Sequence, residues 1–381
     1  FAGLDIEGED NGVIRVEYNP NRPDYSSDYG IFRALRGIMG IELGLPKFSQ
    51  KKTDYSIIVD SQTKNLRPHI VALVATGGTL DNLTIKQMIA MQEDLHEGIG
   101  RRRKRASIGL HDLDAIRFPL RYTAVDKDYS FVPLDESSSK TITEILEVTP
   151  TGRQYGHILG SSDKYPIIQD NSGNVLSFPP IINGSVTKVD EKTRNIFVEV
   201  TATSSKVAED ILAIIAITLR DAGFSIGSVA IQSKGKRITT PRMNSSNISA
   251  DLTYINSVLG LDLDGRQIVK CLQKSRLGAI VKGSKVNCEV PRYRTDISGP
   301  IDLAEEVALG FGIYNLEPTL PASLIAGTKS RLSGHFDAIR ETLVGLGMLE
   351  SLNFSLTSAD IQYGSFERPE RDILGVDGPK S

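Results

Sequence analysis

The chain has no tryptophan and only two cysteines among its 381 residues. Cys271 and Cys288 form neither a CxxC motif nor a histidine-paired spacing, so the usual pattern of a zinc site is missing. Two cysteines in a chain of this length do not indicate a secreted disulfide scaffold either. We therefore expect a protein of the reducing cytoplasm.

Long apolar runs are also missing. No stretch approaches about 18 consecutive apolar residues, so we expect no membrane span. The first segment, FAGLDIEGEDNG, is acidic and lacks a signal-peptide pattern. Because the formal net charge is −3, no global basic field indicates a nucleic-acid partner, and any RNA contact must come from local patches. The chain starts without Met and stops at GVDGPKS, from which we expect a fragment.

Apolar residues make up an ordinary 40% of the chain, enough for two to four domains. Strands and helices alternate, which predicts a multidomain α+β or α/β protein. We expect four pieces, with the following boundaries: residues 1–62, an N-terminal remnant and linker; 63–234, a mixed-sheet domain; 235–322, a winged-helix-like domain; and 323–381, the truncated start of another domain.

Periodicity places the elements within these pieces. Helices are expected near residues 31–39, 84–99, 207–219, 251–259, 264–274, from 302 onward, and 335–345. Strands are expected near residues 56–60, 70–76, 118–125, 196–202, 225–232, 279–281, 285–291 and 352–356. Thr84 and Gln87 are a candidate capping box for the second helix.

Six motifs stand in a fixed order: NPNRPDYSSDYGIFRALRGIMGIELGLP, RRRKRASIGLHDLDAIRFP, GRQYGHIL, NVLSFPPIING, IFVEVTATS and RYRTDISGPIDLAEEVALGFGIYN. Taken alone, the first is what a proline-fixed turn would contain. As an ordered set over essentially the whole chain, they resemble the β subunit of phenylalanyl-tRNA synthetase in its archaeal and eukaryotic form.

The resemblance implies a hydrolytic editing domain, at residues 63–234, that removes tyrosine wrongly attached to tRNA(Phe). It implies Glu199 and Thr201 as editing catalytic residues, and Ile168 and Ser177 as residues of the amino-acid pocket. Ile168 stands where archaeal members typically carry Leu, and Glu199 where some carry Asp. Both exchanges alter side-chain reach, so they affect the dimensions of the pocket.

The resemblance also implies partners and cofactors. The last piece would begin a class II synthetase catalytic-like domain. ATP and phenylalanine would be activated on a separate α subunit, in a heterotetramer of two α and two β chains. A magnesium site would involve four carboxylates, those of Asp296, Asp302, Glu305 and Glu306. Spacing alone favours the alternative, a helix start at Asp302 with a capping box and an acidic first turn.

The residues independently allow an editing pocket. In IFVEVTA, a strand period of two places Phe197, Glu199 and Thr201 on one face, with Ile196, Val198 and Val200 on the core face. The alternative is a solvated strand face. In YPIIQDNSGNVLSFPP, a four-residue turn at 170–173 would set Ile168 opposite Val175, with Ser177 on their face.

A carboxylate suits the chemical problem, because tyrosine differs from phenylalanine by one hydroxyl. Glu199 would accept a hydrogen bond from that hydroxyl, whereas phenylalanine would leave the acceptor desolvated and unpaired. The difference is roughly 1–3 kcal/mol or more. A positioned water and the terminal ribose hydroxyl would serve the hydrolysis, since no Ser-His-Asp or Cys-His order supports a covalent route.

Two histidines and a basic run leave alternatives open. His111 and His157 are either general bases or hydrogen-bonded structural residues. The run GRRRKR, residues 100–105, either contacts tRNA phosphates or forms a solvated helix end. A non-catalytic docking subunit is the alternative to an editing enzyme, and the acidic residues 296–306 argue against a simple duplex-binding module.

Overall fold

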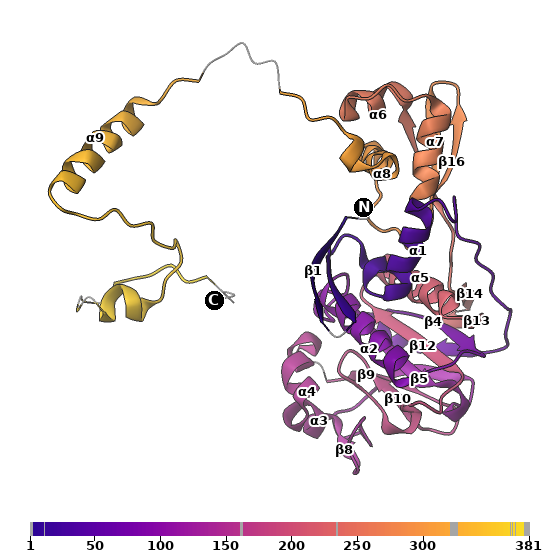
Figure 1. The fold of residues 1–381 in the computed structure, drawn as a ribbon. Helices are drawn as coiled ribbons and strands as arrows, with labels where there is room; N and C mark the ends of the chain where they lie inside the picture. The colour runs from indigo at the N-terminus through magenta and orange to yellow at the C-terminus, as the bar shows by residue number, and fades with distance from the viewer. Residues whose placement is uncertain are drawn as a thin grey trace. The chain divides into compact units, whose positions relative to one another are not determined.

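A computed structural model of the chain describes residues 3–10, 12–160, 163–233, 235–320, 327–365, 367, 369 and 371–376. The chain falls into two compact units, Phe1–Glu317 and Pro318–Ser381. Among the described residues, no helix combines the length and apolarity needed to cross a membrane. The predicted mixture of helices with a large mixed sheet is confirmed (Figure 1).

A ten-stranded mixed sheet occupies the middle of the first unit (Figure 1). In spatial order its strands are β11 (Ile182–Asn183), β10 (Val175–Phe178), β9 (Tyr165–Gln169), β6 (Leu120–Val125), β3 (Ser56–Val59), β13 (Ser225–Ser233), β4 (His69–Thr76), β12 (Ile196–Ala202) and β5 (Ala106–Asp112), with β14 (Lys236–Thr240) beside β13. β13 joins the two halves, because its first residues pair antiparallel with β4 and its last residues pair parallel with β3.

β12 lies between β4 and β5, antiparallel to both, and all seven of its residues are buried. Its side chains alternate as predicted. Ile196, Val198 and Val200 face a core that includes two helices, whereas Phe197 belongs to a second core on the other side. A strand buried on both faces is apolar on both, and the polar Glu199 and Thr201 are the exceptions.

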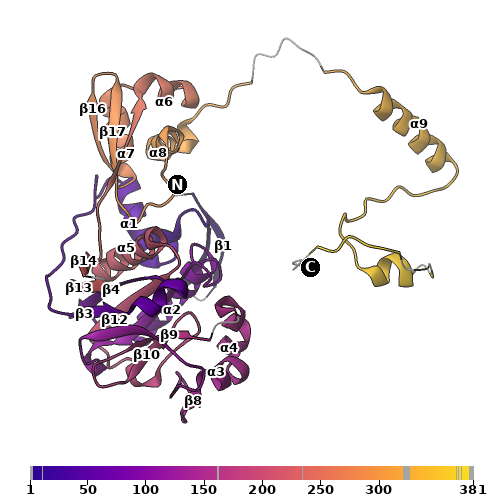
Figure 2. The ribbon, with the colours of Figure 1, turned by 180° about the vertical axis from the view of Figure 1, so that it is seen from behind.

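Helices cover the sheet on one side, and smaller elements surround it. The helices of the first unit are α1 (Asp28–Ile38), α2 (Asn82–Glu97), α3 (Ile142–Val148), α4 (Pro150–Tyr155), α5 (Ser205–Asp221), α6 (Leu252–Leu259), α7 (Gly265–Lys274) and α8 (Pro300–Phe311), with short turns η1 (Pro23–Tyr25), η2 (Ser61–Asn65), η3 (Leu113–Ala115), η4 (Gly156–Leu159), η5 (Ser185–Thr187) and η6 (Ile313–Asn315). α2 and α5 share one core with β4, β12 and β5. α3 and α4 pack near β9 and β10, over a separate core (Figure 2).

The sheet curls until its two ends meet. β11 and β5 are the first and last strands in the spatial order. Asn183 on β11 nevertheless donates its side-chain amide to the Leu110 carbonyl on β5, at 3.4 Å. A twisted sheet of this size tends to curl, and here the curl encloses the core around Phe197, Tyr122 and Ile168.

Two local predictions in the first unit are wrong. α2 begins at Asn82 and is capped by Asp81, whose carboxylate accepts from the Thr84 N–H at 2.7 Å, so the Thr84–Gln87 box does not form. In the β9–β10 hairpin the turn lies where it was expected, but the register shifts. Ser177 pairs with Ile168, and Val175 pairs with Gln169, because an irregularity separates the two strand pairs.

The helices and hairpin predicted for the third piece are present. α6, α7 and α8 pack with a three-stranded sheet of β15 (Ser246–Asp251), β17 (Lys285–Val290) and β16 (Gly278–Lys282) around their own core. β15 was not predicted. Two small antiparallel pairs complete the unit, β1 (Leu4–Asp10) with β2 (Val13–Tyr18), and β7 (Ser130–Phe131) with β8 (Lys140–Thr141).

The second unit contains the predicted helix, α9 (Arg331–Gly345), capped by Ser330, and a short turn, η7 (Asp360–Gly364). No α9 residue is buried. The strand predicted at 352–356 is wrong, because those residues adopt no strand pairing and their large apolar side chains are exposed. A strand without a neighbour has no partner for its backbone groups.

A buried ionic cluster links the loop before α1 to the third piece. Asp24 is buried and accepts from Arg22 at 2.9 and 3.0 Å, and Arg22 lies 4.0 Å from Asp296. Arg294 donates to Asp296 at 2.9 Å and also pairs with Glu306. Burial disfavours its charge, yet Glu306 and Asp296 hold the pKa of Arg294 well above its usual value.

The Arg294→Met variant tests this cluster. It removes the cation that Asp296 and Glu306 share. The buried Glu306 carboxylate loses this partner, and Asp296 keeps only the more distant Arg22, at 4.0 Å. We expect a loss of about 3–5 kcal/mol in the free energy of unfolding, measured by urea titration with circular dichroism. Arg266→Met, an exposed arginine on α7, is the control and should change stability by less than about 0.5 kcal/mol. Equal effects of the two variants would contradict the role given to the cluster.

Candidate functional site

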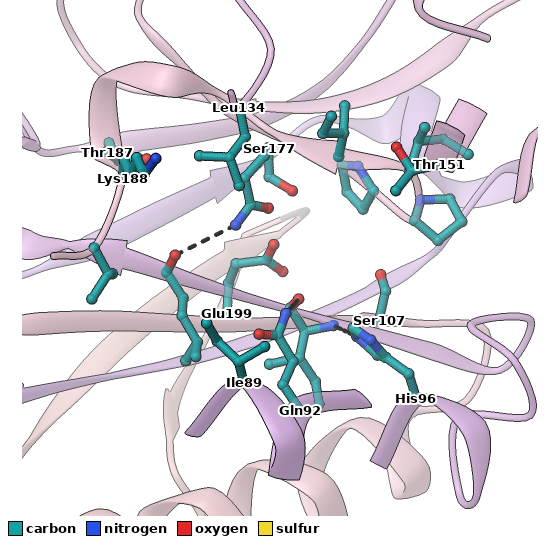
Figure 3. A pocket seen from close by; sticks show the side chains of 18 of the residues that line it. Ile89, Gln92, His96, Ser107, Leu134, Thr151, Ser177, Thr187, Lys188 and Glu199 are labelled. Atoms are coloured by element: carbon teal, nitrogen blue, oxygen red, sulfur yellow. Dashed lines mark hydrogen bonds between the residues drawn. The ribbon is translucent and has the colours of Figure 1, made fainter. Parts of the chain in front are cut away.

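A cavity of about 320 Å³ opens between the free edge of β5 with α2 and the segment from Ser177 to Val189. Figure 3 shows Ile89, Gln92 and His96 on one side, Leu134, Ser177 and Thr187 on the other, and Glu199 between them. Most of its walls are apolar. The polar side chains that line it are those of Gln92, Glu93, His96, Arg103, Ser107, Asp135, Thr151, Ser177, Asn183, Thr187, Lys188 and Glu199.

The free edge of β5 is covered by α2 side chains. The Ile108 N–H donates to His96 Nε2 at 2.9 Å, and Gln92 donates to the Ile108 carbonyl at 2.8 Å. Unpaired edge groups would otherwise need water or another chain. Burial lowers the pKa of His96, which keeps its imidazole neutral and able to accept this hydrogen bond. His96 was not singled out from the sequence.

Glu199 occupies the space that Gly109 leaves. The two residues pair directly across β12 and β5. A Cβ at position 109 would lie 2.4 Å from Glu199 Oε1, closer than any real side chain allows. Glu199 is only 1% exposed, and its Oε2 has no hydrogen-bond partner among the described residues. A buried carboxylate that lines a cavity with one oxygen unpaired is suited to accept a hydrogen bond from a ligand.

His111 lies beside Glu199, on the same face of β5 as Gly109. Its Nδ1 is 2.8 Å from the Thr187 hydroxyl, and its ring lies 5.9 Å from that of Phe197. Its Nε2 lies 4.0 Å from Glu199 Oε1 and has no hydrogen-bond partner among the described residues. His111 is fully buried and does not itself line the cavity. The other candidate base, His157, lies on η4 and does not line the cavity.

Thr201 lies behind Ser107, outside the cavity wall. Its hydroxyl accepts from Arg67 Nε at 3.0 Å and is 2.9 Å from the Ser107 hydroxyl, and Ser107 lines the cavity. Arg67 is buried, and burial lowers the pKa of its guanidinium to about 10. It also donates to the carbonyls of Arg103 and Thr201 at 2.9 and 3.2 Å, which fixes the end of the cavity at that side.

The two predicted pocket residues lie in different places. Ser177 is buried and lines the cavity. Ile168, its pairing partner, packs in the core with Tyr122, Leu176 and Phe197 and is not among the residues that line the cavity. The structure therefore gathers Glu199 and Ser177 at the cavity and places Thr201 and Ile168 behind its walls.

The basic run has two different roles in the structure. α2 ends at Glu97, and Arg101, Arg102 and Arg103 have φ values of 52°, 51° and 62°. Such left-handed residues cost roughly 1–2 kcal/mol each. Arg103 turns inward, donating to the carbonyls of Pro180 and Ile181 at 3.3 and 3.2 Å, with its guanidinium 4.3 Å from the centre of the Tyr155 ring. It ties the two sides of the cavity together.

The basic run has four other cations, and all of them are exposed next to Arg103: Arg101, Arg102, Lys104 and Arg105. They form a basic patch, which hereafter means these four residues. Arg102 forms an exposed ion pair with Glu97 at 3.3 Å, which contributes little stability. The patch is therefore available to an anionic partner.

Three of the four carboxylates implied as magnesium ligands are bound by protein groups. Asp302 accepts from the N–H groups of Ser298 and Gly299 at 2.7 and 2.8 Å, as the alternative of a helix start predicted. Asp296 and Glu306 are bound by Arg294. Burial, and then Glu306, raise the pKa of Glu305.

Within the residues that the structure describes, no group of three or more histidine, cysteine, aspartate or glutamate side chains is placed to hold a metal ion. A buried arginine bound to two of the four carboxylates also opposes a second cation there. Asp296, Asp302, Glu305 and Glu306 therefore do not fit a magnesium site in this structure.

Sequence comparisons place the chain among tRNA synthetase proteins. A model described as the B3/4 domain matches residues 91–214, and one described as the tRNA synthetase B5 domain matches residues 248–313. A phenylalanine–tRNA ligase beta subunit from Archaeoglobus fulgidus is 39% identical over 382 residues, covering 100% of this chain and 70% of that protein. The protein of the same name from Methanosarcina acetivorans is 37% identical, covering 98% and 68%.

A solved structure agrees with these sequence matches. An N-terminal fragment of the phenylalanyl-tRNA synthetase beta-subunit from Pyrococcus horikoshii superimposes with a TM-score of 0.79 and 34% identity, covering 81% of this chain and 91% of that one. Most cavity residues discussed above, including Gln92, Ser177 and Glu199, lie within the stretch matched by the B3/4 model.

The Gly109→Ala variant tests whether Gly109 is needed to hold the Glu199 carboxylate. The added methyl group should lower the free energy of unfolding by about 1–3 kcal/mol because it meets that carboxylate and the His111 ring. In a Glu199→Ala background the cost should fall by at least about 0.5 kcal/mol. Both are measured by urea unfolding.

Gly8→Ala is the matched control, because a Cβ there meets nothing within 4 Å. It should leave stability nearly unchanged. If Gly109→Ala lowers the free energy of unfolding equally with and without the Glu199 carboxylate, the two positions are independent. Gly109 would then not be needed to hold that carboxylate.

Proposed function

Because this chain belongs to the family of phenylalanine–tRNA ligase β subunits, and is thus a component of an aminoacyl-tRNA synthetase, we propose that its cavity hydrolyses tRNA(Phe) carrying tyrosine by mistake. Glu199 recognises the tyrosine hydroxyl, and Ser177 contributes to the same wall. The observation that carries this proposal is the buried, partly unpaired Glu199 carboxylate in an apolar cavity.

The cavity has the properties that such a substrate requires. Its apolar walls, among them Met88, Ile89 and Leu134, suit an aromatic ring. Its volume of about 320 Å³ falls in the range of small-ligand sites. A phenylalanyl group would fill the same walls but leave Glu199 without a donor, at a cost of roughly 1–3 kcal/mol. Correctly charged tRNA is thereby spared.

The reaction is hydrolysis of the ester between the amino acid and the terminal ribose. A water oxygen attacks the carbonyl carbon, the bond to the ribose oxygen breaks, and that oxygen takes up a proton. Ser107, Ser177 and Thr187 supply hydroxyls along the wall that can orient the water. Thr201 acts indirectly, by holding Ser107 at 2.9 Å.

The remaining functions are those of a subunit. We propose that the chain pairs with an α subunit, in an assembly of two α and two β chains, and that ATP-dependent charging of tRNA(Phe) takes place on α. The compartment is the cytoplasm, in keeping with two buried free cysteines. The basic patch at the rim supports contact with tRNA phosphates near the cavity.

Glu199→Gln tests the editing proposal. It removes the negative charge while keeping the shape of the side chain. The parent should hydrolyse Tyr-tRNA(Phe) faster than Phe-tRNA(Phe), and the variant should lose about 10–100-fold of that preference. The measurement is release of radiolabelled amino acid from each tRNA, with circular dichroism to confirm folding.

Glu289→Gln, an exposed glutamate on β17, is the control and should behave as the parent. A parent that shows no preference for the tyrosyl ester would favour the alternative, a docking subunit without editing. A Glu199→Gln variant that discriminates as well as the parent would remove Glu199 from the recognition step.

The basic patch yields a separate prediction. Changing Arg101, Arg102, Lys104 and Arg105 together to Gln should weaken tRNA binding equally for all sequences. It should also reduce the slope of log K against log salt by roughly 1–3, since each lost phosphate contact removes about 0.7–0.9. The measurement is filter binding across a salt series. The control changes Lys282 and Lys285, two exposed cations of the β16–β17 hairpin, and should leave the slope unchanged. Equal slopes for the parent, the patch variant and this control would exclude the basic patch from the tRNA interface.

A further inference from the structure

Two buried polar atoms at neighbouring positions have no hydrogen-bond partner in the described part of the chain, His111 Nε2 and Glu199 Oε2. His111 Nε2 lies 4.0 Å from the other carboxylate oxygen, Glu199 Oε1, which is too long for a direct hydrogen bond. Buried donors and acceptors nearly always have partners. The two atoms therefore indicate a group that comes from outside the protein.

A single oxygen atom can bridge His111 Nε2 and Glu199 Oε1. An atom at an ordinary hydrogen-bond distance of about 2.8 Å from each fits between two atoms that are 4.0 Å apart. A Cβ at Gly109 would lie 2.4 Å from Glu199 Oε1 and 2.6 Å from His111 Nε2. The carboxylate and the imidazole therefore both pack against the glycine, and a larger residue at position 109 would displace them.

The donor and acceptor roles of Glu199 and His111 determine which chemical group can bridge them. An ionised Glu199 can only accept a hydrogen bond. His111 Nδ1 is 2.8 Å from the Thr187 hydroxyl, and when this hydroxyl donates, the ring proton stays on Nε2. The third group must then donate to Glu199 and accept from His111. A phenol hydroxyl does both, an aromatic amine donates but accepts poorly, and a phenyl ring does neither.

We propose that His111 is a second specificity-determining residue of the cavity, and that it donates through Nε2 to the tyrosine hydroxyl while Glu199 accepts from it. This inference rests on the editing function proposed above. Of the two side chains, Glu199 lines the cavity wall and His111 is buried directly behind it. Thr187 holds the ring in the required orientation, and Phe197 packs beside it.

The test uses the whole chain and tRNA(Phe) esterified with tyrosine, p-aminophenylalanine or phenylalanine. His111→Leu removes the donor. His111→Gln also removes the ring but keeps an N–H near the position of Nε2. Any loss due only to missing packing against Phe197 will therefore appear in both variants. The measurement is kcat/KM for deacylation of each ester, with circular dichroism to confirm folding.

We expect His111→Leu to lower kcat/KM for the tyrosyl ester about tenfold, the value of one buried hydrogen bond. The p-aminophenylalanyl and phenylalanyl esters should change less than twofold, because neither accepts from His111. His111→Gln should recover most of the tyrosyl rate. This pattern supports the proposal.

Three results would overturn it. Unchanged tyrosyl hydrolysis in His111→Leu would show that the ring nitrogen is not used. Equal losses in both variants would show that the ring matters only for packing. An equal loss for all three esters would show that a bound water, and not the substrate, bridges the two side chains. A parent without preference for the tyrosyl ester, by contrast, refutes the editing function itself and is seen before any variant is made.

Discussion

The site depends on one carboxylate, that of Glu199. It is held inside a curled sheet, opposite Gly109, where the neighbouring strand β5 has no side chain to fill the space. Burying a carboxylate is unfavourable unless its oxygens find partners. Here Oε2 finds none among the described residues, and His111 Nε2 lies 4.0 Å from Oε1. Such an arrangement is tolerated when the surrounding structure fixes it, and it favours a ligand that supplies the missing donor.

The surrounding structure is fixed by contacts between segments far apart in the chain. Asn183 joins the two ends of the sheet through the Leu110 carbonyl. Arg103, in the loop before β5, binds the Pro180 and Ile181 carbonyls. Arg67 donates to the Thr201 hydroxyl behind the wall, and that hydroxyl lies 2.9 Å from the hydroxyl of Ser107, which lines the cavity. The two arginines donate several hydrogen bonds each, so the cavity is built from rigid elements and not from a loose loop.

Part of this could be predicted from the sequence. The alternation in β12 correctly separated the core residues from Glu199 and Thr201, and the hairpin turn before β10 was found. β5 was missed because its residues follow a basic run assigned to a helix end and because Gly109 weakens a strand pattern. The same period of two that identified β12 would have placed Gly109 and His111 on one face.

Three other features arise from long-range packing, which local periodicity does not contain. They are the register of the β9–β10 hairpin, the position of Thr201 behind Ser107, and the ion pair between Arg294 and Asp296.

The most direct test is a crystal structure of the chain with adenosine carrying tyrosine on its ribose through an amide, which cannot be hydrolysed. We expect the aromatic ring in the cavity, against Ile89 and Leu134, with the phenol oxygen within hydrogen-bond distance of Glu199. Density for the ring elsewhere, or a ring turned with its hydroxyl toward solvent, would contradict it.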